Sequence, residues 1–154
     1  MKISKKTISF KAAVRDTPDI RHNCKAGLQG LGKYSSKVEL GDTRACEGSV
    51  DIDSSTASVY PNESRWDYCF SYKGSVYFIE VHPAQTSQIS TVLNKLKWLK
   101  EWLAQKAPKI NELKAKGEPY YWIQSNGFHI PKTSAQYRAA IEKGIKPIGK
   151  LSLN

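Results

Sequence analysis

Residues 66–82 read WDYCFSYKGSVYFIEVH, two largely apolar runs on either side of Lys73-Gly74. The pattern indicates a β-hairpin, and a two-residue turn at Lys73-Gly74 places Asp67 directly opposite Glu80. Directly opposed residues project from the same face of a sheet, with Cβ atoms roughly 4.5–5.5 Å apart. Two carboxylates held this close repel each other. A divalent cation gives a reason to keep both, because hard cations prefer oxygen ligands, so we expect Asp67 and Glu80 to be metal ligands.

This interpretation depends on the register of the hairpin. A three-residue loop would place Asp67 opposite Val81, on the wrong face of the sheet. The alternative to a metal site is an edge hairpin on which both acids are solvated. Against that alternative, Glu80 lies between Ile79 and Val81, where burying a lone carboxylate would be costly or would raise its pKa.

His82 follows Glu80 by two residues, so both side chains project from the same face of the strand. An imidazole titrates near neutral pH and could orient a water, accept a proton or bind a metal. A histidine at the end of a strand could equally face solvent, and both interpretations stay open. The second strand is largely apolar on both faces, which is typical of a central strand covered on both sides.

Hydrophobic periodicity predicts the remaining elements. The clearest helix begins near Ile89, where apolar residues follow a 3.6-residue period and lysines leave the apolar stripe. Before the hairpin, we expect a helix from Thr17 to about Leu31 and strands around 38–40 and 50–52. After it, we expect helices over 89–106 and 110–116, a strand at 120–123 and a turn at 126–127, with residues 128–130 continuing that strand or forming its partner. A helix from 133 or 134 to 142 and a last strand over 145–153 follow.

This order of elements predicts an α/β fold in three layers, with a central mixed β-sheet flanked by helices. The 154 residues fit a single domain spanning 1–154, in which residues 1–16 form a basic and irregular N-terminal segment. The apolar fraction of 40% is that of a globular protein.

Charge and cysteine content narrow the partners and the compartment. The sequence has 24 Lys and Arg against 14 Asp and Glu, a formal net charge of +10, which favours nucleic acid as partner over a merely basic surface. No apolar window approaches the ~18 residues of a membrane helix, so no membrane is expected. Cys24, Cys46 and Cys69 are widely spaced, and with no secretory signal they suggest free thiols in the cytoplasm.

The hairpin and the elements after it resemble the PD-(D/E)XK nuclease superfamily. In that superfamily an Asp opens the second core strand and a Glu-x-Lys closes the third, and an amphipathic helix, a strand, a helix and a strand follow. Asp67 and Glu80 match the two acids, and His82 stands where the family has Lys. The resemblance implies a restriction-endonuclease-like fold and a nuclease that uses Mg²⁺ or Mn²⁺ to hydrolyse phosphodiester bonds, with DNA favoured over RNA.

The resemblance also suggests roles for residues outside the hairpin. Lys95 or Lys97 on the following helix could replace the missing lysine, as lysines migrate in some members. Gln88 could correspond to a polar residue on that helix and join Asp67, Glu80 and His82 in catalysis. The acid on the family's first helix has no clear match, and Glu39 and Glu47 are guesses. The nucleic-acid contacts expected on the long helix are Lys95, Lys97 and Lys100.

Other interpretations stay open. The replacement of Lys by His82 favours a nuclease-like fold that has lost catalysis and binds nucleic acid or a partner protein. A basic adaptor without a metal site is a third alternative, and a homodimer is compatible with each.

Residues 27–33 fit G-x-x-x-x-G-K, but Tyr34 stands where a phosphate loop needs Ser or Thr, so no phosphate loop is expected.

Overall fold

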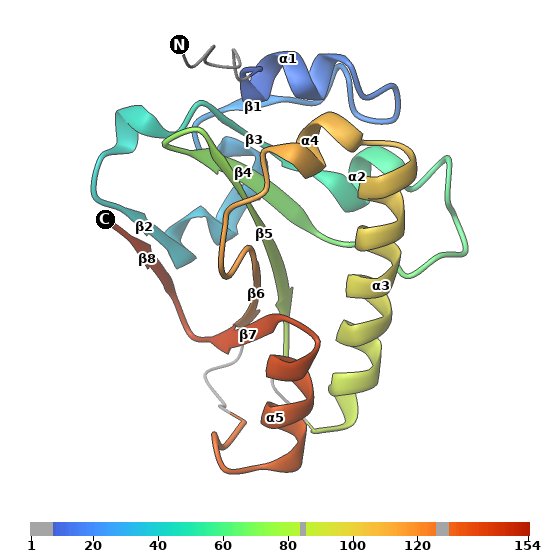
Figure 1. Cartoon of the computed structure of the whole chain (residues 1–154), viewed down its shortest axis with the longest axis vertical. Helices are drawn as coiled ribbons and strands as arrows, with labels where there is room; N and C mark the ends of the chain where they lie inside the picture. Colours follow the sequence, from blue (N-terminus) through green and yellow to red (C-terminus); the bar gives the residue numbers. More distant parts are fainter. Residues whose placement is uncertain (1–7, 84–85, 126–129) are drawn as a thin grey trace, which may run out of the picture.

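The computed structural model describes residues 8–83, 86–125 and 130–154. Its main feature is a six-stranded sheet in the order β1-β3-β4-β5-β6-β7 (Figure 1). Neighbours run antiparallel from β1 to β5 and parallel from β5 to β7, which confirms the predicted α/β class and mixed sheet. The strands are β1 (Lys25–Ala26), β3 (Gly48–Asp51), β4 (Tyr68–Tyr72), β5 (Ser75–His82), β6 (Tyr120–Gln124) and β7 (Ile145–Ile148).

The hairpin of β4 and β5 has the predicted two-residue turn. Lys73 and Gly74 both have positive φ, 49° and 81°, as a type I′ hairpin turn requires. Tyr72 pairs with Ser75, and the register continues without a bulge back to Tyr68, the first residue of β4. Glycine carries the larger positive φ at no steric cost, so the sequence determines this register locally.

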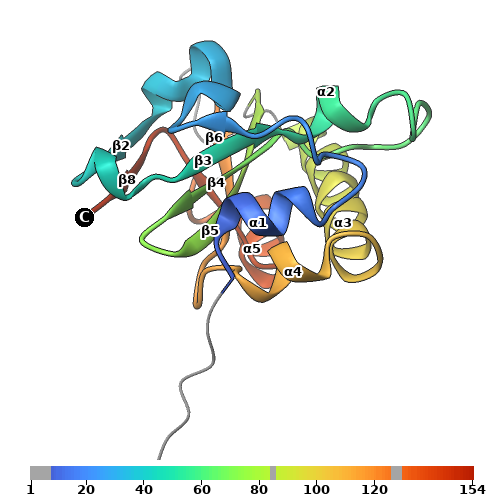
Figure 2. The ribbon, with the colours of Figure 1, turned by 90° about the horizontal axis from the view of Figure 1, so that it is seen from above.

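Helices cover one face of the sheet. Their apolar side chains pack with Val76 and Phe78 of β5 and with Trp122 of β6 in a single core. Figure 2 shows these helices together on one side of the strands. They are α1 (Phe10–Arg15), α3 (Ile89–Gln105), α4 (Pro108–Glu112) and α5 (Ala135–Glu142). The short helix α2 (Ile52–Thr56) directly follows β3 and adds Ile52 to the same core.

The opposite face is covered differently from the expectation of flanking helices. Among the described residues its cover is the 3₁₀-helical segment η1 (Gln29–Lys37) and a small parallel sheet of β2 (Val38–Leu40) and β8 (Leu151–Leu153) (Figure 2). Leu31 and Ile79 are among the buried residues of this second core. The third layer is therefore made of 3₁₀ turns and two short strands.

The helix predicted from Thr17 to about Leu31 is wrong. The chain forms α1 (Phe10–Arg15) earlier, where the Ser9 side chain caps the helix. Thr17 instead helps to end α1, because its hydroxyl donates to the carbonyl oxygen of Ala13 at 2.8 Å. The residues that follow form turns, β1 and η1.

The expectation that the basic segment 1–16 is irregular is wrong for residues 10–15, which form α1. Phe10, Ala13 and Val14 of α1 are buried in the core on the helix-covered face of the sheet. Residues 1–7 lie outside the described residues. The segment therefore contributes apolar packing as well as charge.

The long helix is confirmed as α3, which buries Ile89, Val92, Leu96, Leu99, Trp102 and Leu103. The helical piece predicted over 110–116 is α4, which begins earlier than expected because Pro108 takes the first helical position. It ends at Glu112, before the predicted end. The strand predicted over 145–153 divides into β7 and β8, which belong to different sheets. The turn predicted at 126–127 lies outside the described residues. None of the helices in the described part of the chain is long and apolar enough to cross a membrane.

Candidate active site

Asp67 and Glu80 meet as the hairpin register predicts. Asp67 directly precedes β4, and Glu80 follows Ile79, the partner of Tyr68. The backbone N–H of Asp67 donates to Glu80 Oε1 at 3.2 Å, and the backbone N–H of Val81 donates to Asp67 Oδ2 at 3.0 Å. These bonds hold the two carboxylates side by side on the helix-covered face.

Lys95 reaches from α3 into this acidic pair. Its Nζ lies 2.5 Å from Glu80 Oε2 and 3.5 Å from Asp67 Oδ1. The Glu80 side chain has no exposed surface, and those of Lys95 and Asp67 are each 18% exposed. One oxygen of each carboxylate is thus held by backbone, and the other faces the same cation.

His82 and Gln88 extend the cluster along β5 and into the turn before α3. His82 Nδ1 lies 3.6 Å from Glu80 Oε2, and His82 Nε2 lies 2.6 Å from Gln88 Oε1. The structure therefore brings together Asp67, Glu80, His82 and Gln88, the four residues expected to be catalytic. Gln88 contacts the histidine, so it can orient the imidazole ring.

Burial and mutual repulsion shape the charges of the cluster. Burial, followed by the negative charge of Glu80, raises the pKa of Asp67 to about 7. Burial disfavours the charged form of Lys95, but the charges of Glu80 and Asp67 outweigh it and the pKa of Lys95 is raised. Contact with Glu80 also raises the pKa of His82, against the effect of burial. Proton occupancy of Asp67 thus changes near neutral pH.

Two further polar residues lie near the cluster and were missed in the sequence. Asp53 raises the pKa of both Asp67 and Lys95 through its charge, and it pairs with Arg65 at 2.8 Å. Gln124 is buried at the end of β6, opposite His82 in the parallel register. Asp53 follows the strand predicted around 50–52, and Gln124 follows the strand predicted at 120–123. Both strands end at the edge of the sheet where β5 ends, and a polar residue at that point is the sequence pattern that could have identified them.

Other expected residues lie elsewhere. Glu39 is on β2 and pairs with Lys150 at 3.7 Å, and Glu47 accepts from the backbone N–H of Lys11 at 2.6 Å. The hairpin does not bring either acid to Asp67, because Glu39 is in the second sheet and Glu47 precedes β3 at the opposite end of the strands. The guess that one of them supplies a further acid is therefore wrong.

The three lysines expected to contact nucleic acid divide between two places. Lys95 is turned into the acidic pair, whereas Lys97 and Lys100 line a groove of about 380 Å³ beside α3 together with Lys143. Lys100 Nζ donates to the carbonyl oxygen of Lys143 at 3.2 Å and lies 5.4 Å from the ring centroid of Tyr120. Burial lowers the pKa of Lys100.

The donor set at the acidic pair suits a divalent metal in part. Among the described residues, no three His, Cys, Asp or Glu side chains are grouped to hold a metal ion. Two carboxylates nevertheless suit Mg²⁺, which typically takes one or two and keeps several waters. Asp67 Oδ1 and Glu80 Oε2 already converge on one cation, the Lys95 ammonium. The pair therefore fits a metal that displaces Lys95 from one or both oxygens.

Comparisons with known proteins add no family. Neither a family model, nor a curated protein, nor a solved structure matches the chain.

Proposed function

We propose that this protein is a metal-dependent nuclease with a restriction-endonuclease-like fold, hydrolysing phosphodiester bonds in nucleic acid, with DNA favoured over RNA. The contact of Lys95 with Glu80 and Asp67 carries the proposal. The sequence has His82 where the PD-(D/E)XK pattern has lysine, and α3 supplies a lysine to the same acids. The set of two acids and one cation is therefore present, with the cation on a different element.

The arrangement of elements supports the same proposal. Strands β3, β4 and β5 form an antiparallel meander, α3 follows, and β6 returns parallel to β5. This is the succession that the resemblance implies around its acidic hairpin. The acids lie at the edge of the sheet where β5 ends, beside the helix that follows it.

Each residue has a role that its surroundings allow. Bound Mg²⁺ or Mn²⁺ would supply an activated water and neutralise charge on the phosphate. Asp67 and Glu80 would hold the metal, and Lys95, whose raised pKa keeps it protonated, would place a positive charge beside the phosphate. His82, whose pKa is raised by contact with Glu80, could exchange a proton with the attacking water, and Gln88 orients its ring.

A second candidate is a nuclease-like fold that binds nucleic acid or a partner protein without cleaving. The observation that favours it is the same ion pair, because Lys95 at 2.5 Å from Glu80 already neutralises the buried carboxylate. When the charge of the carboxylates is already balanced by a lysine, a metal gains less by binding there. The two candidates differ in whether a metal displaces Lys95.

Calorimetric titration of Mn²⁺ and Mg²⁺ into wild type and Asp67→Asn, with a cleavage assay on DNA and RNA from the same preparation, separates them. The control is Glu112→Gln, which changes an exposed acid of α4 by the same charge. The nuclease requires metal binding and cleavage in wild type and Glu112→Gln and the loss of both in Asp67→Asn. Nucleic-acid binding without metal binding or cleavage would establish the second candidate instead.

A further inference from the structure

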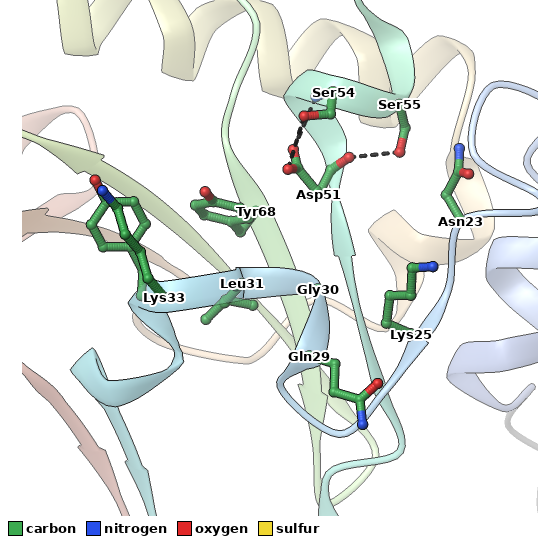
Figure 3. A pocket seen from close by; sticks show the side chains of 12 residues that line it. Asn23, Lys25, Gln29, Gly30, Leu31, Lys33, Asp51, Ser54, Ser55 and Tyr68 are labelled. Atoms are coloured by element: carbon green, nitrogen blue, oxygen red, sulfur yellow. Dashed lines mark hydrogen bonds between the residues drawn. The ribbon is translucent and has the colours of Figure 1, made fainter.

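A hollow of about 580 Å³ lies on the sheet face opposite α3, at the ends of β3 and β4 (Figure 3). A volume of this size is in the range of small-ligand pockets, roughly 300–1,000 Å³. Two cations, Lys25 and Lys33, lie on either side of Gly30 in Figure 3. Tyr68 forms part of the wall between Lys33 and Asp51.

The glycine-rich segment 27–33 forms one wall of this hollow. It is not a phosphate loop between a strand and a helix, because η1 begins within it. The backbone N–H of Gly30 donates to Ser49 Oγ at 2.7 Å, and a Cβ on Gly30 would lie 2.8 Å from the backbone carbon of Ser49. Gly32 has a φ of 56° and turns the chain. Gly30 lets the segment lie close against β3, and Lys33, which follows the turn at Gly32, stays exposed.

The chemistry of the lining residues suits a nucleotide. Tyr34 and Tyr68 are in ring contact with centroids 6.3 Å apart, and Lys33 Nζ lies 5.2 Å from the Tyr34 centroid. Aromatic faces stack bases, and lysines attract phosphates. Asp51 is the acid of the lining, and its carboxylate accepts from the backbone N–H and the hydroxyl of Ser54, both at 2.9 Å. A phosphate is therefore expected at the lysines, away from Asp51.

The hollow and the acidic pair are adjacent across the end of the sheet. Tyr68 lines the hollow, and the residue before it, Asp67, faces Lys95 on the other side. Asp51 pairs with Tyr68 in the β3–β4 register, and the backbone N–H of Ile52 donates to the carbonyl oxygen of Asp67 at 2.8 Å. A strand of nucleic acid that passes this edge can reach both places.

We propose that this hollow binds one unpaired nucleotide of a nucleic-acid strand whose neighbouring phosphate lies at Asp67 and Glu80. The placement of that phosphate rests on the proposed nuclease function. A base can stack on Tyr34 or Tyr68 only when it has left the double helix, so the site selects single-stranded ends, loops or flipped bases. The substrate class is thus DNA or RNA with unpaired residues beside the cleaved bond.

Fluorescence anisotropy in EDTA tests the binding without cleavage. The probes are a labelled blunt DNA duplex, the same duplex with a short single-stranded overhang, and the overhang strand alone. The variants are Lys25→Gln/Lys33→Gln and Tyr34→Leu. The matched control is Lys114→Gln/Lys116→Gln, two exposed lysines near the start of β5 and so at the opposite end of the sheet.

Wild type and the control should bind the overhang duplex and the single strand more tightly than the blunt duplex. Tyr34→Leu should weaken binding to the unpaired probes about tenfold and leave the blunt duplex unchanged, because stacking is lost. Lys25→Gln/Lys33→Gln should reduce the preference for the unpaired probes over the blunt duplex. It should also make the affinity for the unpaired probes less dependent on salt concentration. Equal binding of all probes by wild type, or equal loss in the control, would overturn the proposal.

A separate cleavage assay with Mg²⁺ distinguishes this inference from the proposed function. Cleavage by wild type without preference for unpaired probes would leave the nuclease standing and remove the nucleotide site. A preference that depends on Tyr34, without cleavage of any probe, would establish the hollow as a binding site and remove the nuclease.

Discussion

The Glu80 carboxylate is the most constrained group of the acidic cluster. It has no exposed side-chain surface, and it contacts the backbone N–H of Asp67, the Lys95 ammonium and the His82 ring. A buried charge is tolerated only when it is paired and hydrogen-bonded. Lys95 therefore has a part in stability that is independent of any role in catalysis.

Replacing Lys95 with methionine should destabilise the metal-free protein. The change removes the cation of a buried pair and leaves Glu80 and Asp67 facing each other, which typically costs about 3–5 kcal/mol. Urea denaturation in EDTA measures the free energy of unfolding. Lys97→Met, an exposed position on the same helix, should change it by less than about 0.5 kcal/mol. Equal stability of the two variants would show that the Lys95 contact is not a tight pair.

Asp67 makes stability depend on pH. Burial and the charge of Glu80 raise its pKa from 3.8 to about 7, so between these values the folded protein holds a proton that the unfolded chain has lost. The folded state is then favoured at low pH, and this contribution disappears as pH rises through about 7.

The free energy of unfolding of wild type, minus that of Asp67→Asn, should accordingly fall from about pH 4 to about pH 7 and then level off. Denaturation curves for both proteins at several pH values without metal provide the measurement. A difference that stays flat over this window, or that rises, would contradict the raised pKa.

Most of this cluster could be predicted because its residues belong to one hairpin with a two-residue turn. Alternation along β5 puts Glu80 and His82 on one face, and the turn brings Asp67 opposite. The contact of Lys95 could not be determined in the same way. The rotation of α3 about its axis is set by the packing of its whole apolar stripe against the sheet. The sequence alone therefore does not show whether Lys95 or Lys97 reaches the two acids.

At the scale of elements, close approach of backbones decides how the third layer packs on the main sheet. Gly30 lets η1 lie directly on β3, whereas Gly32 has nothing within 4 Å of an added Cβ but carries a positive φ. Gly30 is therefore required because there is no room for a side chain, and Gly32 because of its backbone conformation.

Gly30→Ala and Gly32→Ala should both destabilise the protein, for different reasons. A Cβ added at Gly30 would lie 2.8 Å from the backbone carbon of Ser49, so η1 must move away from β3, and overpacking of this kind costs about 1–3 kcal/mol. Gly32 has a φ of 56° and a ψ of −131°, a region that residues with a Cβ rarely occupy, and an alanine forced into it costs about 1–3 kcal/mol. Urea denaturation measures the loss of stability of each variant. A Gly30→Ala variant as stable as wild type would mean that η1 is free to shift.

Elements with a long pattern could be predicted, and short ones could not. The 17 residues of α3 carry enough periodicity to identify it, whereas the 6 residues of α1 do not complete two turns. Thr17 before Pro18 resembles a helix start, but the hydroxyl of Thr17 satisfies a carbonyl of the preceding α1. The same chemistry serves either end of a helix, and tertiary packing decides which.

At the scale of the whole molecule, the formal net charge of +10 should make nucleic-acid binding strongly dependent on salt. The Lys97→Gln/Lys100→Gln variant removes two charges from the groove beside α3. Each lost phosphate contact should reduce the slope of log affinity against log salt by about 0.9 for duplex DNA. Anisotropy titrations at several salt concentrations measure this slope, with Lys114→Gln/Lys116→Gln as control. An unchanged slope would exclude the groove from the duplex path.

The pairing of β2 with β8 has a consequence for the order of folding. Glu39 and Ser152 are register partners that lie 113 residues apart in the chain. This sheet can form only when the loop between them closes, and closing so long a loop costs entropy. We therefore expect the sheet to form late, after the hairpin and α3. During synthesis on the ribosome, the apolar side chains of Val38 and Leu40 must wait for residues 151–153 to emerge, and until then the face that carries the hollow is open to chaperones and to other nascent chains.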